Sequence, residues 1–495
     1  MPSAHSRATR STRAGIAALT GLVAAAGCAV GPNFQRPAAP TSGYQLRPEQ
    51  LGSERLTVAG DVAGDWYRLF GSTSLDALVQ EALRANPDLE AARRNLIAAR
   101  YELQAVAGSA LPQIELDAKA MRARVNGSFL FKPVEEFQAT ANEFTIGPSF
   151  AYDLDVFGRL RRTIEAQAAQ TDQVAHEVLN VRITLVSNVV LTAFDVAAAG
   201  EQIEVTRQLI EELQAQYDLT GKLEAAGKAT RSDTLQAQAQ LESIRAGLPG
   251  LQKQLDVYRN ALRRLLGSAP SERVLPAITL KDFALPVEIP LSLPSQLVRQ
   301  RPDILEAEDL LHQASAQIGV AEAARFPDFQ LTAQYAQQSG MTSDLFSKAA
   351  QIWTAGVNVT TPIFEGGRLR AREKEARQRY LEVAAQYRGT LIDAFVEVAN
   401  SLEALERDNE SYAARTTSVD AARTNRDLAR LLFERGKASE LVVLTAEQQY
   451  QNAALAEVQS DVQRFADVAQ LFYALGGGWW KDDAASIAPG ARNGP

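Results

Sequence analysis

Residues 144–161 read FTIGPSFAYDLDVFGRLR, and residues 353–370 read WTAGVNVTTPIFEGGRLR. In both segments apolar and polar residues alternate, and a Gly-Arg-Leu-Arg motif follows. Alternation with a period of two residues predicts a β-strand that has one apolar face and one polar face. Since the two segments lie 209 residues apart, they indicate that the chain is duplicated.

Other landmarks recur in the same order along the chain. Landmarks before the strands recur at a spacing of 215 residues and those after them at 209, so a loop between them is six residues longer in the first half. Loops tolerate such changes, and we expect two halves with the same fold. The matched landmarks are Pro87-Asp88 with Pro302-Asp303, Pro112 with Pro327, Gly158-Arg159 with Gly367-Arg368, Gly227-Lys228 with Gly436-Lys437, and Leu266-Gly267 with Leu475-Gly476.

Each half is predicted to run helix, two strands, long helix and shorter helix. No proline occurs from residue 158 to 226 or from 363 to 488, and apolar residues there follow the alternating spacing of four and three that is typical of a coiled-coil seam. Roughly 70 helical residues form a rod of about 100 Å. Residues 86–108 and 228–266 would match that length if these two shorter helices stacked end to end.

Four segments carry the alternating pattern, at residues 113–120, 144–155, 328–335 and 353–360. Each is about as long as a tilted transmembrane strand, and the acidic, amide-rich polar face suits a water-filled lumen. The alternative is a soluble antiparallel sheet that packs on a helix. A secretion signal at the N-terminus and the absence of a mature apolar stretch of 18 residues or more favour a transmembrane barrel.

Four strands cannot close a barrel, and an open edge in hydrocarbon leaves backbone hydrogen-bonding groups unpaired. The chain is therefore predicted to oligomerise. Because a barrel of eight strands is filled by its own side chains, three chains make a better conduit than two, and four chains stay an open alternative.

The N-terminus has the features of a bacterial lipoprotein signal. Three arginines and no acid precede an apolar run over residues 14–26, which is too short to span a bilayer as a mature helix. Residues 25–28 resemble a lipobox, in which Cys28 becomes the lipid-modified N-terminus of the mature protein. The alternative is an ordinary cleaved signal with an incidental cysteine. Ala29 after the cysteine implies passage to the outer membrane.

Composition disfavours several classes of function. The chain has 51 Lys and Arg against 59 Asp and Glu, a net charge of −8, and no basic stripe suited to a phosphate backbone, so nucleic-acid binding is not expected. Three histidines and one cysteine are too few and too scattered for a zinc cluster or a Cys-His catalytic pair. We therefore expect no catalytic residues, no metal site and no cofactor.

Short segments along the chain match a known family. They are GCAVGPNF at residues 27–34, Arg36-Pro37, WYRLF at residues 66–70, NPDL at residues 86–89, Ile289-Pro290 to Leu297, RPDI at residues 301–304 and IGVA at residues 318–321. Taken together, these segments resemble the TolC-like outer membrane factors, and specifically the NodT-type outer membrane efflux lipoproteins. The resemblance covers essentially the whole mature chain.

The resemblance implies an α+β membrane protein with a duplicated helix-strand-strand-helix-helix repeat. It implies a homotrimer whose 12-stranded transmembrane β-barrel lies in the outer membrane of a Gram-negative bacterium. A long α-helical barrel would continue from that β-barrel into the periplasm. The chain would be lipid-anchored and in contact with outer membrane lipids.

The implied function is that of the outer membrane channel in a tripartite efflux system. The channel would passively conduct small molecules supplied by an inner-membrane RND-type pump, and a periplasmic adaptor (membrane fusion) protein would dock on it. A type I secretion outer membrane channel is one alternative. A non-conducting lipid-anchored periplasmic coiled-coil scaffold is another, and a cell-wall enzyme is disfavoured because no nucleophile, base or metal site converges.

The turns after the two long helices are the expected adaptor contacts by resemblance. Glycine suits the left-handed turn that reverses a chain between antiparallel helices, so ordinary turn chemistry also explains these residues. The candidate docking residues are Gly227, Lys228, Arg231, Gly436, Lys437 and Ser439.

A charged stripe before the second turn is the candidate periplasmic gate. Its members are three, four and three residues apart and so share one helix face, and the resemblance implies inward carboxylates there. The alternative is a solvated, ion-paired helix face. If the stripe lines a narrow pore, the three copies of Asp427 in a trimer would make its conductance sensitive to cations or pH. The candidates are Asp420, Arg423, Asp427 and Arg430, with Glu211 and Asp218 at the equivalent positions of the first half.

The sequence therefore predicts six regions. They are a lipoprotein signal peptide (1–27), a lipid-anchored linker and equatorial segment (28–85), the first repeat (86–267), an equatorial connector (268–300), the second repeat (301–476) and a C-terminal tail expected to be disordered (477–495).

Overall fold

The computed structural model describes residues 29–38, 55–58, 62–126 and 138–479. The chain divides into two compact units, and each unit draws on both halves of the sequence. The first contains residues up to 37, 97–173 and 307–387, and the second contains residues 38–96, 174–306 and 388 onward.

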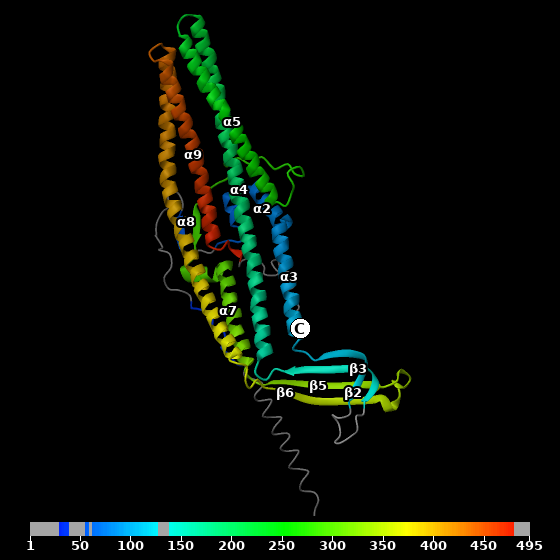
Figure 1. Cartoon of the computed structure of the whole chain (residues 1–495). Coiled ribbons are helices and arrows are strands. Elements are labelled where there is room, and N and C mark those ends of the chain that lie inside the picture. The colour runs from blue at the N-terminus through cyan, green and yellow to red at the C-terminus, as the bar shows by residue number, and fades with distance from the viewer. Residues whose placement is uncertain (1–28, 39–54, 59–61, 127–137, 480–495) are drawn as a thin grey trace, which may run out of the picture. The chain divides into compact units, whose positions relative to one another are not determined.

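The elements occur in the predicted order in both halves (Figure 1). The first half contains α3 (Pro87–Gly108), β2 (Gln113–Asn126), β3 (Gln138–Leu154), α4 (Arg159–Ala225) and α5 (Arg231–Leu265). The second contains α7 (Pro302–Ala323), β5 (Asp328–Ser339), β6 (Gln351–Thr360), α8 (Arg368–Glu434) and α9 (Glu440–Ala474). The remaining elements are β1 (Arg55–Val58), η1 (Trp66–Phe70), α2 (Thr73–Ala85), η3 (Leu280–Asp282), β4 (Glu288–Leu291), α6 (Pro294–Gln300), η4 (Thr342–Asp344) and η5 (Lys348–Ala350).

The helices of the two halves have equal lengths. Both α4 and α8 contain 67 residues, and both α5 and α9 contain 35. The expectation that the mature chain has no apolar stretch of 18 residues or more is wrong. Helix α4 contains an 18-residue stretch that is apolar enough to cross a membrane. Two thirds of that stretch (67%) is buried inside the protein, which fits a core helix.

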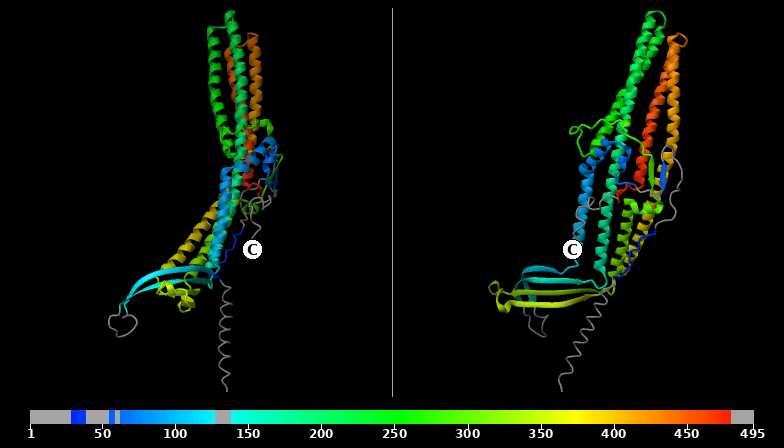
Figure 2. Two further views of the ribbon diagram at one scale, coloured as in Figure 1. Left: turned by 90° about the vertical axis from the view of Figure 1, so that its right-hand side faces the viewer. Right: turned by 180° about the vertical axis from the view of Figure 1, so that it is seen from behind.

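The first unit contains one antiparallel sheet of four strands in the order β2-β3-β5-β6 (Figure 2). Directly opposed residues form a row across the sheet and share a face. One row is apolar and consists of Ile114, Phe150, Ala333 and Ala355. The adjacent row is polar and consists of Glu115, Ser149, Gln334 and Thr354. The predicted alternation is therefore present in all four strands.

Several apolar side chains of the sheet are largely uncovered within the chain. Ile114 is 74% exposed, Leu116 is 73% exposed and Trp353 is 75% exposed. Among the described residues, β2 and β6 each pair with one strand only, so the sheet has two unpaired edges. Such a surface requires further partners outside the chain.

The core of the second unit contains an aromatic cluster. The Phe70 ring lies 5.0 Å from that of Phe194, and Phe194 lies 5.4 Å from Phe465. The Trp66 ring lies 5.3 Å from that of Phe472. Trp66 and Phe70 come from the WYRLF segment, so this short segment supplies two of the largest fully buried side chains.

A repeated hydrogen bond joins the short helices end to end in the second unit. The Asn86 side-chain amide donates to the carbonyl oxygen of Leu265 (2.9 Å), and Arg301 Nη1 donates to that of Ala474 (2.7 Å). These are equivalent positions in the two halves. The first bond brings the last turn of α5 to the start of α3, which confirms the stacking predicted from helix lengths.

Glycines close both joints. Gly267 has φ 69° and Gly476 has φ 90°, which are left-handed conformations after a helix end. A Cβ at Gly267 would lie 2.2 Å from the carbonyl oxygen of Ala85, and one at Gly476 would lie 3.0 Å from that of Gln300. Only glycine therefore fits the close approach at the first joint.

Arg301 is the stronger of the two caps. Its buried guanidinium also pairs with Asp303 and Glu397, both at 2.7 Å. Burial by itself lowers the pKa of Arg301, but the hydrogen bonds and charges of Asp303 and Glu397 outweigh burial and raise it, so Arg301 stays charged.

We predict that Arg301→Ala destabilises the protein more than Asn86→Ala. Removing the buried cation leaves carboxylates uncompensated and should cost about 3–5 kcal/mol, whereas loss of the neutral cap should cost about 1–2 kcal/mol. Unfolding of the detergent-solubilised protein in guanidinium chloride measures both changes. Exposed Arg299→Ala on α6 is the control, and equal losses at Asn86 and Arg301 would contradict the assignment.

Candidate functional site

The turns that end α4 and α8 have the same backbone geometry. Gly227 (φ 70°) and Gly436 (φ 67°) are left-handed. After them, the Lys228 amide donates to the carbonyl oxygen of Leu223, and the Lys437 amide donates to that of Leu432, both at 2.8 Å. These bonds satisfy the last helical carbonyls and reverse the chain. Both predicted glycine turns are therefore present.

The helices that follow the turns begin differently. In the first hairpin, Thr230 and Asp233 form a reciprocal cap, and hydrogen bonds from the backbone and side chain of Thr230 lower the pKa of Asp233. Ser439, at the equivalent place before α9, makes no side-chain cap. The two turns thus have the same backbone conformation but differ in the side-chain contacts that cap the following helix.

The predicted docking residues lie on the surface of these turns. Lys228, Arg231, Lys437 and Ser439 are all exposed, and Arg231 lies 3.7 Å from the Glu224 carboxylate. Apolar side chains beside them are also uncovered. They are Leu235 (48% exposed), Leu441 (61%) and Val442 (48%). The turns therefore present a mixed basic and apolar surface.

The predicted gate residues on α8 separate into two groups. Asp420 pairs with Arg423 (3.3 Å), and Asp427 pairs with Arg426 (2.9 Å). Both carboxylates are more than half exposed. Arg430, which the spacing grouped with them, instead pairs with residues of two other helices.

Arg430 joins three helices of the second unit. Its guanidinium lies 2.6 Å from the Glu212 carboxylate on α4 and also pairs with Glu447 on α9. Arg426 approaches the same Glu212 at 3.5 Å. The Glu447 side chain is only 3% exposed, and burial raises its pKa while Arg430 opposes that rise. This set, Glu212, Arg426, Arg430 and Glu447, is called the three-helix ion network below.

Tyr450 extends this network along α9. The Arg426 guanidinium lies 4.1 Å from the centre of the Tyr450 ring, and that of Arg423 lies 5.9 Å from it. Both distances are within the range of a cation–π contact. Tyr450 therefore holds two arginines of α8 beside α9.

A second contact joins α4 to the start of α9. The Thr220 hydroxyl donates to Glu440 Oε1 (2.5 Å), and the Gln216 amide donates to the same oxygen (3.4 Å). The Glu440 side chain is buried and its other oxygen has no hydrogen-bond partner in the part of the chain that the structure describes. Burial raises the pKa of Glu440, and the two hydrogen bonds oppose that rise.

The first-half gate candidates lie outside the three-helix ion network. Glu211 is exposed, and Asp218 accepts a hydrogen bond from the Gln214 amide (2.9 Å). The residue that enters the network is Glu212, the neighbour of Glu211. Sequence reasoning missed Glu212, Arg426, Glu447 and Tyr450.

Two signals could have identified part of this set. Glu447 falls among Val443, Leu444 and Ala446, so a carboxylate occupies an otherwise apolar helix face. The internal repeat also departs from symmetry here. Gly221 and Gln238 occupy the positions equivalent to Arg430 and Glu447, which shows that the ion pair was not duplicated.

Cys28 lies outside the described residues, but the segment that follows it is described. The Val30 amide donates to the carbonyl oxygen of Phe157 (3.0 Å), at the junction between β3 and α4. Arg162 donates to the carbonyl oxygens of Val30 and Gly31, both at 3.2 Å, and to the side-chain oxygen of Asn33 at 2.8 Å. Residues 29–37 are called the N-terminal strap below.

We predict that Arg430→Ala loosens the second hairpin. The substitution leaves the buried Glu447 carboxylate without its cation, at a cost of about 3–5 kcal/mol. Hydrogen exchange should therefore accelerate in α8 and α9 around residues 426–450, and adding Glu447→Gln should restore much of the protection. The exposed Asp420→Ala is the control, and unchanged exchange in Arg430→Ala would contradict the network.

Comparison with known proteins agrees with this architecture. The family model described as outer membrane efflux protein matches residues 78–268 and 293–477, which correspond to the two halves. The cation efflux system protein CusC of Escherichia coli O6:H1 is 30% identical over 461 residues, 92% of this chain and 97% of CusC.

Two further matches cover similar lengths. "Probable outer membrane lipoprotein SilC" of Salmonella typhimurium is 30% identical over 462 residues, 92% of this chain and 96% of SilC. The solved structure of the outer-membrane channel OprN is 28% identical, with a TM-score of 0.82 over 91% of this chain and 100% of OprN. With a duplicated fold and a family match that covers both halves, the chain belongs to the outer membrane efflux protein family.

Proposed function

We propose that three copies of this chain form the outer membrane duct of a tripartite efflux system. As a family member, the chain is an outer membrane channel component of an efflux pump, and members of the family are channels rather than enzymes. The trimer is supported by the four-stranded sheet, which has two unpaired edges and exposed apolar side chains. Three such sheets supply 12 strands, which leave an aqueous bore.

The duct works by passive conduction. A sheet that is apolar on its outer face and polar on its inner face lets water and solutes pass while lipid contacts only apolar side chains. The energy comes from an inner-membrane pump of the RND type, and a periplasmic adaptor connects that pump to the duct. Neither catalysis nor a cofactor has a role in this mechanism.

The turns after α4 and α8 are the proposed adaptor contacts. Exposed Lys228 and Lys437 are flanked by Leu235, Leu441 and Val442, whose side chains are 48–61% exposed. Exposed apolar groups with adjoining charges are typical of a protein–protein contact. The adaptor would cover these leucines and valines and pair with the lysines.

The gate is proposed to involve both groups of α8 residues. Asp420 and Asp427 are exposed and would form rings of carboxylates in a trimer, together with Glu211 and Asp218 from α4. The three-helix ion network would hold α8 against α4 and α9 and so keep those rings narrow. Rearrangement of the Arg430 contacts would widen the bore.

Lipidation of Cys28 is the proposed membrane anchor. The adjacent residue, Ala29, lies against Gly158, where an added Cβ would lie 2.6 Å from the Ala29 Cβ. Gly158 immediately precedes α4 and follows the end of β3. An acylated Cys28 would therefore attach at the end of the sheet, where its chains can enter the bilayer.

We predict that the purified protein in planar bilayers gives discrete conductance steps, which become larger in an Asp420→Ala, Asp427→Ala double variant. Removing two rings of carboxylates removes charges that bind cations in a narrow bore. Lys228→Ala is the control, because it alters a turn and leaves the rings intact. Absence of steps from correctly assembled wild-type protein would instead support the lipid-anchored scaffold.

A further inference from the structure

Strands β2 and β3 separate their charged residues by face. The register between them is continuous over all 14 residues of β2, so no bulge moves a side chain from one face to the other. Arg122 and Arg124 therefore lie on the face of Ile114, which is the apolar face of the sheet. The four carboxylates of the two strands all lie on the other face, and they are Glu115, Asp117, Glu143 and Asp153.

The cross-strand neighbours of the two arginines are polar and uncharged. Arg122 is opposite Asn142, Arg124 is opposite Thr140, and all four residues are exposed. The remaining cation of these strands, Lys119, lies on the carboxylate face, 3.5 Å from Glu143. The apolar face of β2 and β3 therefore carries two cations and no acid.

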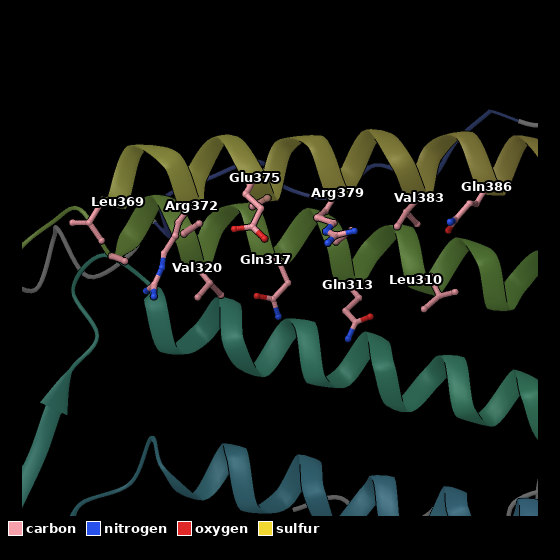
Figure 3. Close-up of a pocket in the computed structure, with 14 residues that line it drawn as sticks. Leu310, Gln313, Gln317, Val320, Leu369, Arg372, Glu375, Arg379, Val383 and Gln386 are labelled. Atoms are coloured by element: carbon pink, nitrogen blue, oxygen red, sulfur yellow. The ribbon is translucent and has the colours of Figure 1, made fainter. Parts of the chain in front are cut away.

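Exposed arginines on the helices of the first unit are arranged differently. In the groove between α7 and α8, Glu375 lies between Arg372 and Arg379 along α8 (Figure 3). On the same helix, Arg377 lies 3.3 Å from the Glu373 carboxylate. Charges of both signs are thus interspersed on α8, whereas they are segregated on β2 and β3.

The two arginines lie beyond the apolar part of their face. Apolar residues occupy that face from Ile114 to Ala120, and Arg122 is the next residue on it. Arg122 is nine positions after Gln113, where β2 begins. At about 3.4 Å per residue and a tilt of about 40°, nine positions rise about 23 Å, which is close to the roughly 25 Å height of the apolar band of a transmembrane barrel. Arg122 thus falls at the edge of this band, at the end of β2 opposite to α3.

We propose that Arg122 and Arg124 bind a phosphate group of lipopolysaccharide on the outer surface of the barrel. The proposal rests on the transmembrane barrel proposed above, with its helices in the periplasm. In that orientation the hairpin end of β2 reaches the outer leaflet, where the phosphates of lipid A lie just above the acyl chains. A guanidinium forms paired hydrogen bonds with a phosphate, and two arginines at alternate positions of a strand are about 7 Å apart, so both can contact one phosphate.

The residues around the arginines favour a lipid phosphate over a free anion. Exposed charges bind a free anion weakly in water. A lipid adds contacts between its acyl chains and the apolar residues of the same face, among which Ala120 and Phe144 are directly opposed in the adjacent row. Asn142 and Thr140 can donate further hydrogen bonds to phosphate or sugar oxygens. Anionic phospholipids of the inner leaflet would meet the other end of the strand, near Gln113.

Native mass spectrometry of the full-length, detergent-solubilised protein with added lipid A tests this site. The Arg122→Gln, Arg124→Gln double variant should bind lipid A about tenfold more weakly, because two exposed charge-assisted contacts are lost. Lys119→Gln is the matched control, since it removes a cation from the opposite face of the same strand and should leave the affinity unchanged. Wild-type protein should also bind dephosphorylated lipid A about tenfold more weakly than lipid A.

The outcomes separate a lipid A site from the alternatives. Equal binding of lipid A to the wild type and the double variant would overturn the site. Phosphatidylglycerol that binds as tightly as lipid A, or excess inorganic phosphate that displaces lipid A, would overturn the assignment to lipopolysaccharide.

Single-channel conductance of the same samples keeps failure of the site apart from failure of the barrel. Unchanged conductance steps in the double variant would show that it folds and assembles. Conducting protein whose lipid A binding does not depend on Arg122 and Arg124 would overturn the site alone. Protein that neither conducts nor binds lipid A would overturn the barrel and the site together.

Discussion

Unpaired backbone groups at the edges of its sheet decide how this chain can enter a membrane. Each unsatisfied N–H or C=O group in hydrocarbon costs several kcal/mol, so only closed barrels place β-strands in a membrane. The antiparallel sheet has four strands, and β2 and β6 each lack a second partner among the described residues. Closure therefore has to come from other copies, and the helices that follow the strands come into contact as a consequence.

Duplication gives both halves the same helices and strands, while individual side-chain contacts differ between the halves. Equal helix lengths and the paired bonds of Asn86 and Arg301 are what a repeat requires. Several side-chain contacts depart from symmetry. Arg430 and Glu447 have Gly221 and Gln238 as counterparts, and Arg162 has Ala371. One hairpin thus holds an ion network, and Arg162 of α4 binds the N-terminal strap, whereas α8 has an alanine at the equivalent position.

The sequence predicted elements whose signals are local. Alternation in β2, β3, β5 and β6 identified the strands, and Gly227 and Gly436 identified the turns, because each depends on neighbouring residues only. Glu212 and Glu447 were missed, since their pairing with Arg430 depends on how three helices align. The apolar stretch in α4 was missed as well, because polar residues interrupt it and no continuous apolar run is present, although its mean hydropathy is high. The gate, adaptor-docking and lipidation assignments stay predictions.

In the assembled channel, one face of the four-stranded sheet is expected to contact lipid and the other to contact water. Single spin labels at each position from 353 to 359 in β6, in protein reconstituted into liposomes, measure this through collisions with oxygen and with a water-soluble nickel complex. We expect oxygen accessibility to peak at Trp353, Ala355, Val357 and Val359, and nickel accessibility to peak at the positions between them. Uniform nickel accessibility along the strand would contradict a transmembrane barrel and leave a soluble sheet.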